Sequence, residues 1–287
     1  MRYLAALLAL AASVGTPLVS VAAAKPLEVR FYSTDPARTL IGGRYYKPTS
    51  GPRPGVVMLH GCSGMRTTSG KLKRRPRFWA EWLVSQGYAV LVADSFTPRG
   101  LSSICEIKDR PLTPDTERPF DAYGALKFLQ AQPEVQADRI ALMGWSNGAM
   151  TLLWTIRTGA RQRPAGLAHG FRAAVAFYPG CIKLKRRAFT TDVPTLLQLG
   201  LADDWTPAGP CLKMVAEART RGTPITADAY DGAHHGFDNP ALPIKRMLTR
   251  NSASKTPERH VHVGTDVQAR VKAVEKVRDF LAEHLAR

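Results

Sequence analysis

The pentapeptide Gly144-Trp145-Ser146-Asn147-Gly148 places a serine between two glycines. It follows the apolar run Ile140–Met143 and precedes Ala149–Thr158, which has helical character. At a sharp strand-to-helix turn, a side chain in place of either glycine would crowd the neighbouring strand or helix. The serine between them would present its hydroxyl at the positive end of the helix. This context predicts a nucleophile at Ser146, although an ordinary glycine-rich turn is the simpler alternative.

A serine hydroxyl becomes a good nucleophile only beside a base, and that base needs a group that orients it. Asp203 and Asp204 follow one apolar run with strand character, and His234 and His235 follow the next. The chain order serine, acid, histidine is the order found in one large class of hydrolases. Each aspartate could instead cap a turn, and each histidine could pack in the core or face solvent. The residues alone do not choose within either pair.

A second glycine-rich segment, His60-Gly61-Cys62-Ser63-Gly64, ends the apolar run Gly55–Leu59. Its glycines allow the backbone to curl so that amide groups face a reacting carbonyl. The N–H of Cys62 and the N–H of Asn147 would then form an oxyanion hole. The alternative is a plain glycine turn, because such loops are weak signals by themselves.

Several side chains are weaker candidates for contacts with a substrate. Arg99 and Arg110 could pair with a substrate carboxylate as planar forks, and they could equally be surface arginines. Trp145 and Trp205 flank the candidate site in sequence. They could line an acyl or aromatic pocket, although packing in the core explains them equally well.

The cysteines number four, an even count that fits two disulfides in an exported chain. Four cysteines allow three pairings. We expect Cys62–Cys105 and Cys181–Cys211, because every one of these residues follows a predicted strand on the side of the site. No two cysteines are close in sequence and no histidine–cysteine cluster has the spacing of zinc ligands, so we expect no metal site. Acyl transfer by a serine nucleophile needs no cofactor, and we expect none.

The elements that must position these residues alternate between short apolar strands and helical stretches. This β-then-α order predicts a mainly parallel sheet of about eight strands flanked by helices, with the site at the carboxyl ends of the strands. Pro98–Pro119 and Asp238–Gly264 break the alternation and are expected to be loops that face a substrate. The strands are expected at Leu27–Tyr32, Leu40–Tyr46, Gly55–Leu59, Tyr88–Ala93, Arg139–Met143, Ala173–Phe177, Thr195–Leu199 and Thr226–Tyr230, and the helices at Phe78–Ser85, Asp121–Gln130, Ala149–Thr158, Leu212–Thr220 and Asp266–Leu285.

The first 24 residues have the pattern of a secretory signal peptide. Arg2 precedes the apolar stretch Leu4–Ala12, and small residues close the segment before Lys25. The apolar stretch is much shorter than the roughly 20 residues that a membrane-spanning helix needs. We therefore expect a signal peptide at residues 1–24, no transmembrane anchor, and one domain at residues 25–287 that is periplasmic or extracellular.

The formal net charge is +17, from 40 basic and 23 acidic residues. Such a surface attracts anionic substrates or polymers. The basic residues are scattered, apart from short runs at Lys71–Arg77 and Lys183–Arg187, and no nucleic-acid-binding module surrounds them. We therefore favour a solvated basic surface and expect no nucleic-acid partner. The sequence gives no indication of the oligomeric state.

With these residues in place, the chain resembles the dienelactone hydrolase family of the α/β-hydrolase fold. The resemblance runs from about Gly55 to the C-terminus. It implies that Asp203 rather than Asp204 is the acid, and that His235 rather than His234 is the base. The matching segments are His60–Gly64, Ala93–Phe96, the serine pentapeptide, Gly200-x-x-Asp203 and His235-Gly236-Phe237.

Two departures from the family pattern change what the resemblance implies. The family's name-giving enzymes carry a cysteine where this chain has Ser146, and their glutamate after the first core strand falls on Gly61. The thiolate mechanism is therefore not expected here. Hydrolysis of a small carboxylic ester or lactone, with an anionic substrate as one option, is the leading hypothesis. The alternatives are a peptidase, or a protein on a hydrolase scaffold that binds a polyanion of the cell envelope.

Overall fold

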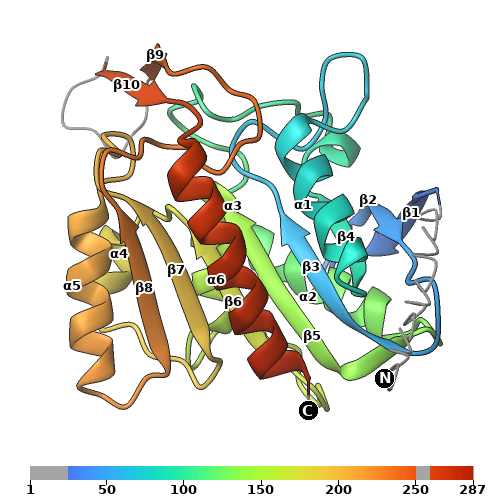
Figure 1. Ribbon diagram of the computed structural model, residues 1–287. Coiled ribbons are helices and arrows are strands. Elements are labelled where there is room, and N and C mark those ends of the chain that lie inside the picture. The colour runs from blue at the N-terminus through green and yellow to red at the C-terminus, as the bar shows by residue number, and fades with distance from the viewer. Residues whose placement is uncertain (1–24, 250–258, 287) are drawn as a thin grey trace, which may run out of the picture.

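The structure, a computed structural model, describes residues 25–249 and 259–286 (Figure 1). The expected signal peptide at residues 1–24 lies outside the described residues. An eight-stranded sheet runs through the centre in the order β1-β2-β4-β3-β5-β6-β7-β8. Its strands are β1 (Leu27–Tyr32), β2 (Leu40–Tyr46), β3 (Arg53–Leu59), β4 (Ala89–Asp94), β5 (Val135–Trp145), β6 (Ala173–Phe177), β7 (Thr195–Gly200) and β8 (Ile225–Tyr230).

The sheet is parallel from β4 to β8, and β1 and β2 join it as antiparallel strands at one edge. Every residue of β4, β6 and β7 is buried. Strands covered on both faces must be apolar along their whole length, which is why they read as continuous apolar runs in the sequence. The predicted α/β architecture and mainly parallel sheet are confirmed.

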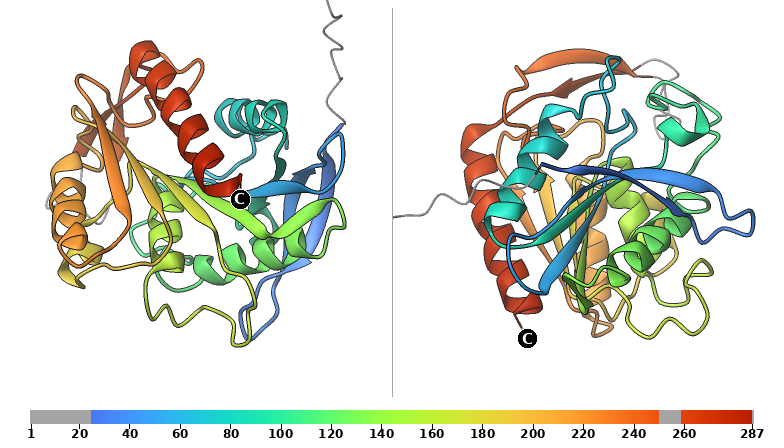
Figure 2. Two further views of the ribbon diagram at one scale, coloured as in Figure 1. Left: turned by 60° about the horizontal axis from the view of Figure 1, so that its bottom comes forward. Right: turned by 90° about the vertical axis from the view of Figure 1, so that its right-hand side faces the viewer.

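Helices cover both faces of the sheet (Figure 2). Residues of α1 and α6 pack in the core of one face, and residues of α2 to α5 pack in the core of the other. The helices are α1 (Arg74–Ser85), η1, a short 3₁₀ helix (Thr97–Arg99), α2 (Arg118–Gln130), α3 (Asn147–Ile156), α4 (Ile182–Arg186), α5 (Ala208–Arg219) and α6 (Val267–Leu285). No helix of the described residues is long and apolar enough to cross a membrane.

Two helices begin one turn earlier than the sequence pattern predicts. The helix α1 begins at Arg74 rather than Phe78, and α5 begins at Ala208 rather than Leu212. Each first turn carries a proline, and neither shows the apolar periodicity of the rest of its helix. Proline fits the first turn of a helix, because the N–H groups of that turn have no partner within the helix.

The expectation that Asp238–Gly264 is entirely a loop is wrong. It holds the antiparallel pair β9 (Lys245–Thr249) and β10 (Arg259–Val263), above the carboxyl edge of the sheet (Figure 1). Val261 and Val263 are buried, whereas Lys245 is exposed. Because only one face is buried, the outer face can carry basic residues. These basic residues made the segment look polar in sequence, so its strands were not predicted. The alternation His-Val-His-Val at residues 260–263 was the available signal.

Candidate active site

Ser146 lies in a sharp turn between β5 and α3, with φ 52° and ψ −115°. A Cβ atom added to Gly144 would lie 2.5 Å from the carbonyl oxygen of Gly148. One added to Gly148 would lie 2.2 Å from the carbonyl oxygen of Leu59, at the end of β3. Both glycines are therefore required by close backbone contacts. The strained conformation of Ser146 is held by its N–H, which donates to the carbonyl of Phe177 at 2.9 Å.

An aspartate and a histidine from neighbouring loops form a direct pair. The Nδ1 atom of His235 lies 2.8 Å from Oδ2 of Asp203, and both side chains are buried. The other oxygen of Asp203 accepts the backbone N–H groups of Trp205 and Thr206, at 2.9 and 2.8 Å. The Thr206 hydroxyl lies 3.0 Å from Asp203 Oδ2 and 3.1 Å from His235 Nδ1. These contacts fix the carboxylate and the orientation of the imidazole.

The other aspartate and the other histidine serve different contacts. Asp204 accepts the backbone N–H of His262 at 2.8 Å, and its second oxygen lies 2.9 Å from the ring of His262. This pair attaches β10 to the loop after β7. The Nδ1 atom of His234 lies 2.9 Å from the carbonyl oxygen of Ala202. Tertiary geometry thus pairs Asp203 with His235, the same choice that the family resemblance implies.

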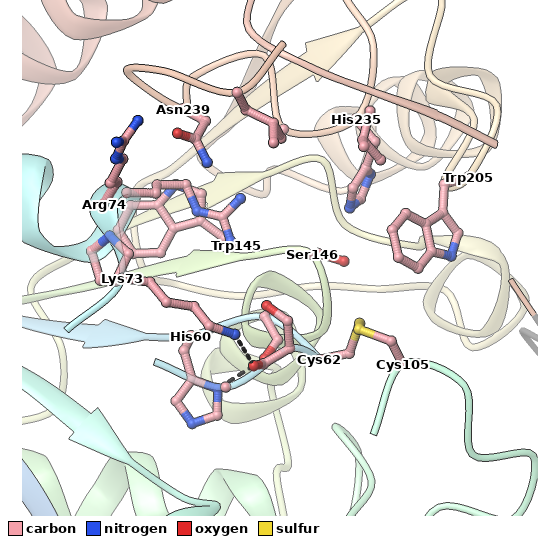
Figure 3. A pocket seen from close by; sticks show the side chains of 18 of the residues that line it. His60, Cys62, Lys73, Arg74, Cys105, Trp145, Ser146, Trp205, His235 and Asn239 are labelled. Carbon is pink, nitrogen blue, oxygen red and sulfur yellow. Dashed lines mark hydrogen bonds between the residues drawn. A yellow bond between two sulfur atoms is a disulfide. The ribbon is translucent and has the colours of Figure 1, made fainter. Parts of the chain in front are cut away.

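The serine and the histidine share one cavity of about 410 Å³, in which the His235 ring points toward the Ser146 hydroxyl (Figure 3). The side chain of Trp205 lies against His235, with ring centroids 4.8 Å apart. Cys62 also lines the cavity. Asn147 is the first residue of α3, so its N–H has no carbonyl partner within that helix. The expected nucleophile, base and backbone donors therefore come from loops that meet at one place.

The loop that carries Cys62 is fixed from several sides. The Cys62–Cys105 disulfide joins it to the segment after β4, and Ile104 donates to the carbonyl of Cys62 at 2.8 Å. The buried His60 ring contacts the Gly61 carbonyl through Nδ1 at 2.8 Å, and the Ser95 N–H donates to Nε2 at 3.3 Å. Burial and the nearby Arg118 lower the pKa of His60 to about 3, so the ring is neutral at pH 7.

Arg118, which the sequence patterns did not single out, connects the two halves of the expected oxyanion hole. Its guanidinium is completely buried and donates to the side-chain oxygen of Asn147 and, at 2.9 Å, to the carbonyl of His60. Burial lowers the pKa of Arg118 to about 10, which still leaves it charged at pH 7. A planar fork suits this position, because it can bind two acceptors at fixed angles.

The position of Arg99 does not support the prediction that it contacts a substrate. It lies outside the cavity, where its two terminal nitrogens each donate to Asp121 at 2.9 Å. Arg110 lines a separate cavity. Trp145 and Trp205 do line the cavity of Ser146, but the indole N–H of Trp145 donates to Asp238 at 2.7 Å and the residue is 1% exposed. Trp145 is therefore mainly a packing residue, and Trp205 is the better placed of the two tryptophans.

A buried polar network beneath the cavity also escaped the sequence patterns. Asp238 accepts the indole N–H groups of Trp79 and Trp145, at 2.8 and 2.7 Å, and the hydroxyl of Tyr178. Arg75 in turn donates to the Tyr178 hydroxyl at 2.9 Å. The ring of Tyr178 packs on His235, with centroids 4.5 Å apart. Neutral donors therefore hold the buried carboxylate of Asp238, and one of these donors, Tyr178, packs on the candidate base.

Both expected disulfides, Cys62–Cys105 and Cys181–Cys211, are present. The second joins the start of α4 to α5 on the other side of the site.

The sheet has eight mostly parallel strands, and a strained serine lies at a strand-to-helix turn. A paired aspartate and histidine follow this serine along the chain. Together these features define a protein of the α/β-hydrolase fold. The sequence model of the dienelactone hydrolase family matches residues 41–285. This chain therefore belongs to the dienelactone hydrolase family and is an enzyme of the hydrolase class.

Comparison with known proteins gives three further similarities. YtaP of Bacillus subtilis (strain 168), which carries the name of a hydrolase, is 32% identical over 122 residues, 38% of this chain and only 40% of that protein. A structure of a dienelactone hydrolase-like promiscuous phosphotriesterase from metagenomic libraries has a TM-score of 0.62 at 21% identity and covers 90% of this chain and 98% of its own. Esterase 2 of Thermogutta terrifontis, phosphorylated by paraoxon, has a TM-score of 0.64 at 16% identity, with coverage of 91% and 96%.

Proposed function

We propose that this chain hydrolyses carboxylic esters, lactones included, through an acyl-enzyme formed on Ser146. The observation that carries the proposal is the 2.8 Å contact between His235 and Asp203, in a cavity that also holds the serine of the strained turn. With its Nδ1–H donated to Asp203, the imidazole has a free lone pair on Nε2. That lone pair is the base that Ser146 requires.

In the first half of the reaction, Nε2 of His235 takes the proton of Ser146 while the serine oxygen attacks the ester carbonyl. The N–H groups of Cys62 and Asn147 donate to the resulting oxyanion. The tetrahedral intermediate collapses, and the leaving alcohol takes the proton from His235. In the second half, His235 deprotonates a water molecule that attacks the acyl-enzyme and releases the acid. Asp203 stabilises the imidazolium in both halves and keeps its own charge.

The experiment is labelling with a fluorophosphonate probe, combined with turnover of p-nitrophenyl acetate. The wild-type protein should be labelled and should turn over the ester, whereas Ser146→Ala should do neither. Ser69→Ala is the matched control, because Ser69 lies exposed in a loop outside the cavity. Equal labelling of the wild-type protein and Ser146→Ala would remove Ser146 as the nucleophile.

A further inference from the structure

A second cavity, of about 510 Å³, shares no lining residue with the cavity of Ser146. Its floor is apolar, because Met150 and Trp154, which lie four residues apart on one face of α3, line it. Trp154 is buried and Met150 is half-buried. Pro114 and the exposed Ile182, the first residue of α4, add to the apolar lining. A cavity of this size and lining is typical of sites for small organic molecules.

The mouth of the second cavity carries charges of both signs. Lys108, Asp109 and Lys183 are exposed there, and Lys183 lies 3.5 Å from the half-buried Asp115. A mixed rim of this kind does not concentrate ions of one sign, in contrast to a cleft whose charges are all alike. The lining therefore favours an uncharged ligand.

Arg110, which also lines the second cavity, has unused hydrogen-bond donors. Its Nη2 atom donates to the carbonyl of Cys105 at 3.2 Å, and its buried Nε has no partner among the described residues. It forms no ion pair with a carboxylate in the described part of the chain. Because a guanidinium carries five N–H donors, an oxygen atom of a ligand can accept from those that remain.

One side chain, that of Thr206, lies between the second cavity and the candidate base. Its hydroxyl lies 3.1 Å from Nδ1 of His235 and 3.0 Å from Oδ2 of Asp203. Its methyl carbon lies 3.8 Å from the position that a Cβ atom on Gly180 would occupy, and both Thr206 and Gly180 line the second cavity. A ligand in this cavity therefore contacts a residue that holds the Asp203–His235 pair.

Gly180 leaves room in the part of the cavity next to Thr206. A Cβ atom at position 180 would lie 3.0 Å from Sδ of Met150, on the floor. The backbone of Gly180 does not adopt the left-handed conformation that favours glycine. The missing side chain at this position is therefore explained by space rather than by backbone conformation.

We propose that the second cavity binds an uncharged aromatic ring that carries an oxygen acceptor, and that Thr206 connects its occupancy to His235. An aromatic ring packs well on the indole of Trp154 and the thioether of Met150, and Arg110 donates to the oxygen. A ring against Thr206 restricts that side chain and keeps its hydroxyl beside the base. Binding at this site does not depend on the ester hydrolysis proposed above, whereas the effect on turnover rests on it.

Binding of 4-methoxybenzyl alcohol, an uncharged aromatic probe, tests the site. At ten times its dissociation constant, the probe should raise the thermal unfolding midpoint of the wild-type protein and of Ser146→Ala by about 2–4 °C. Ile182→Trp places a large side chain at the mouth of the second cavity and should abolish this shift. Met150→Trp fills the cavity from its floor and is the second blocked variant. Leu212→Trp is the matched control and should keep the shift, because Leu212 is exposed on α5 and lines neither cavity.

Turnover identifies the source of the ring. If the ring belongs to a separate molecule, the free probe should raise kcat for p-nitrophenyl acetate about fivefold in the wild-type protein and not in Ile182→Trp. If the ring is part of the substrate, acetate esters of 4-methoxyphenyl alcohols with linkers of increasing length are compared with alkyl acetates of equal length. At one linker length kcat/KM should then be about 10-fold or more higher for the aromatic ester, and Ile182→Trp should remove this advantage.

The outcomes separate the site, its connection to the base and the proposed function. No shift of the unfolding midpoint in the wild-type protein, or an equal shift in both blocked variants, would overturn the site. A shift that the blocked variants lose, without either effect on turnover in the active enzyme, supports the site and overturns its connection to His235. The same shift in a protein that hydrolyses no ester supports the site and removes the proposed function.

Discussion

At the scale of single residues, adjacent residues of the same type have different roles in the site. Asp203 and Asp204 are adjacent carboxylates, yet one orients His235 and the other binds β10 through His262. The hydrogen bonds of His262 lower the pKa of Asp204, despite the opposing effect of burial. The side chain of His234 likewise turns away to a backbone carbonyl. Position in space, rather than residue type, assigns these roles.

Replacement of the two aspartates is therefore expected to have unequal effects. Asp203→Asn removes the charge that stabilises the imidazolium and disturbs the tautomer of His235, so kcat for p-nitrophenyl acetate should fall about 10³- to 10⁴-fold. Asp204→Asn should change kcat by less than about threefold, because Asp204 contacts β10 and not His235. Steady-state kinetics of both variants makes the comparison. Equal losses would contradict the assignment of Asp203.

The buried His60 leads to a prediction about how the stability of the protein depends on pH. Its pKa in the folded protein is about 3, lowered by burial, whereas an unfolded chain has an ordinary histidine pKa near 6.5. Below pH 6.5 the unfolded state therefore binds a proton that the folded state does not. The contribution of His60 to the free energy of unfolding should fall by up to about 1.4 kcal/mol per pH unit as the pH drops from 6.5 towards 3.

The measurement is urea unfolding of the wild-type protein and of His60→Gln at pH 7.5 and pH 5. His60→Gln keeps a donor and an acceptor but has no proton to bind, so its stability should decline less between these two pH values. The difference between the two declines isolates His60 from the other histidines. The same decline in both proteins would mean that His60 does not carry this dependence.

At the scale of elements, the site depends on loops that are attached to one another rather than to the sheet alone. The loop after β3 is connected to the turn that carries Ser146 by Arg118, and to the segment after β4 by the Cys62–Cys105 disulfide. The Cys181–Cys211 disulfide joins α4 to α5 instead. The two disulfides close segments of similar length, with sequence separations of 43 and 30. The two disulfides differ because only Cys62–Cys105 contains a residue whose N–H is an expected oxyanion donor.

Removal of the two disulfides should therefore separate stability from activity. The double variants Cys62→Ala/Cys105→Ala and Cys181→Ala/Cys211→Ala should each lose about 2–4 kcal/mol of stability. Only the first should also lose kcat, by about 10-fold or more at a temperature where both are folded, because the N–H of Cys62 would be less well fixed. Denaturant unfolding and ester turnover measure the two effects. Equal kcat values would show that the disulfide does not position this donor.

At the scale of the whole molecule, two disulfides fit a protein that works outside the cytoplasm. We propose that residues 1–24 direct its export. The full-length chain, expressed in a bacterium with a periplasm, should be recovered from that compartment with Lys25 as its first residue. Its intact mass should lack four hydrogen atoms relative to the reduced chain. Cytoplasmic protein that retains residues 1–24 would contradict export.

The sequence by itself determined the features that depend on neighbours along the chain. The turn at Ser146 could be predicted because a serine flanked by Gly144 and Gly148, between an apolar run and a helical stretch, is a pattern within one short segment. The contact that requires Gly148, with the carbonyl oxygen of Leu59, comes from far along the chain. Strand and helix order could be predicted because buried parallel strands are apolar throughout. Both signals are complete within a short segment.

Tertiary structure alone decided which distant residues meet. The selection of Asp203, already implied by family resemblance, has its physical cause in a contact between loops 32 residues apart. Arg99 had the sequence position expected of a substrate ligand, yet Asp121 from another element takes its guanidinium. Arg75, Arg118 and Asp238 carry no motif, because each acts through partners far along the chain. Charge and hydrogen-bond partners depend on three-dimensional distance, which short sequence patterns do not encode.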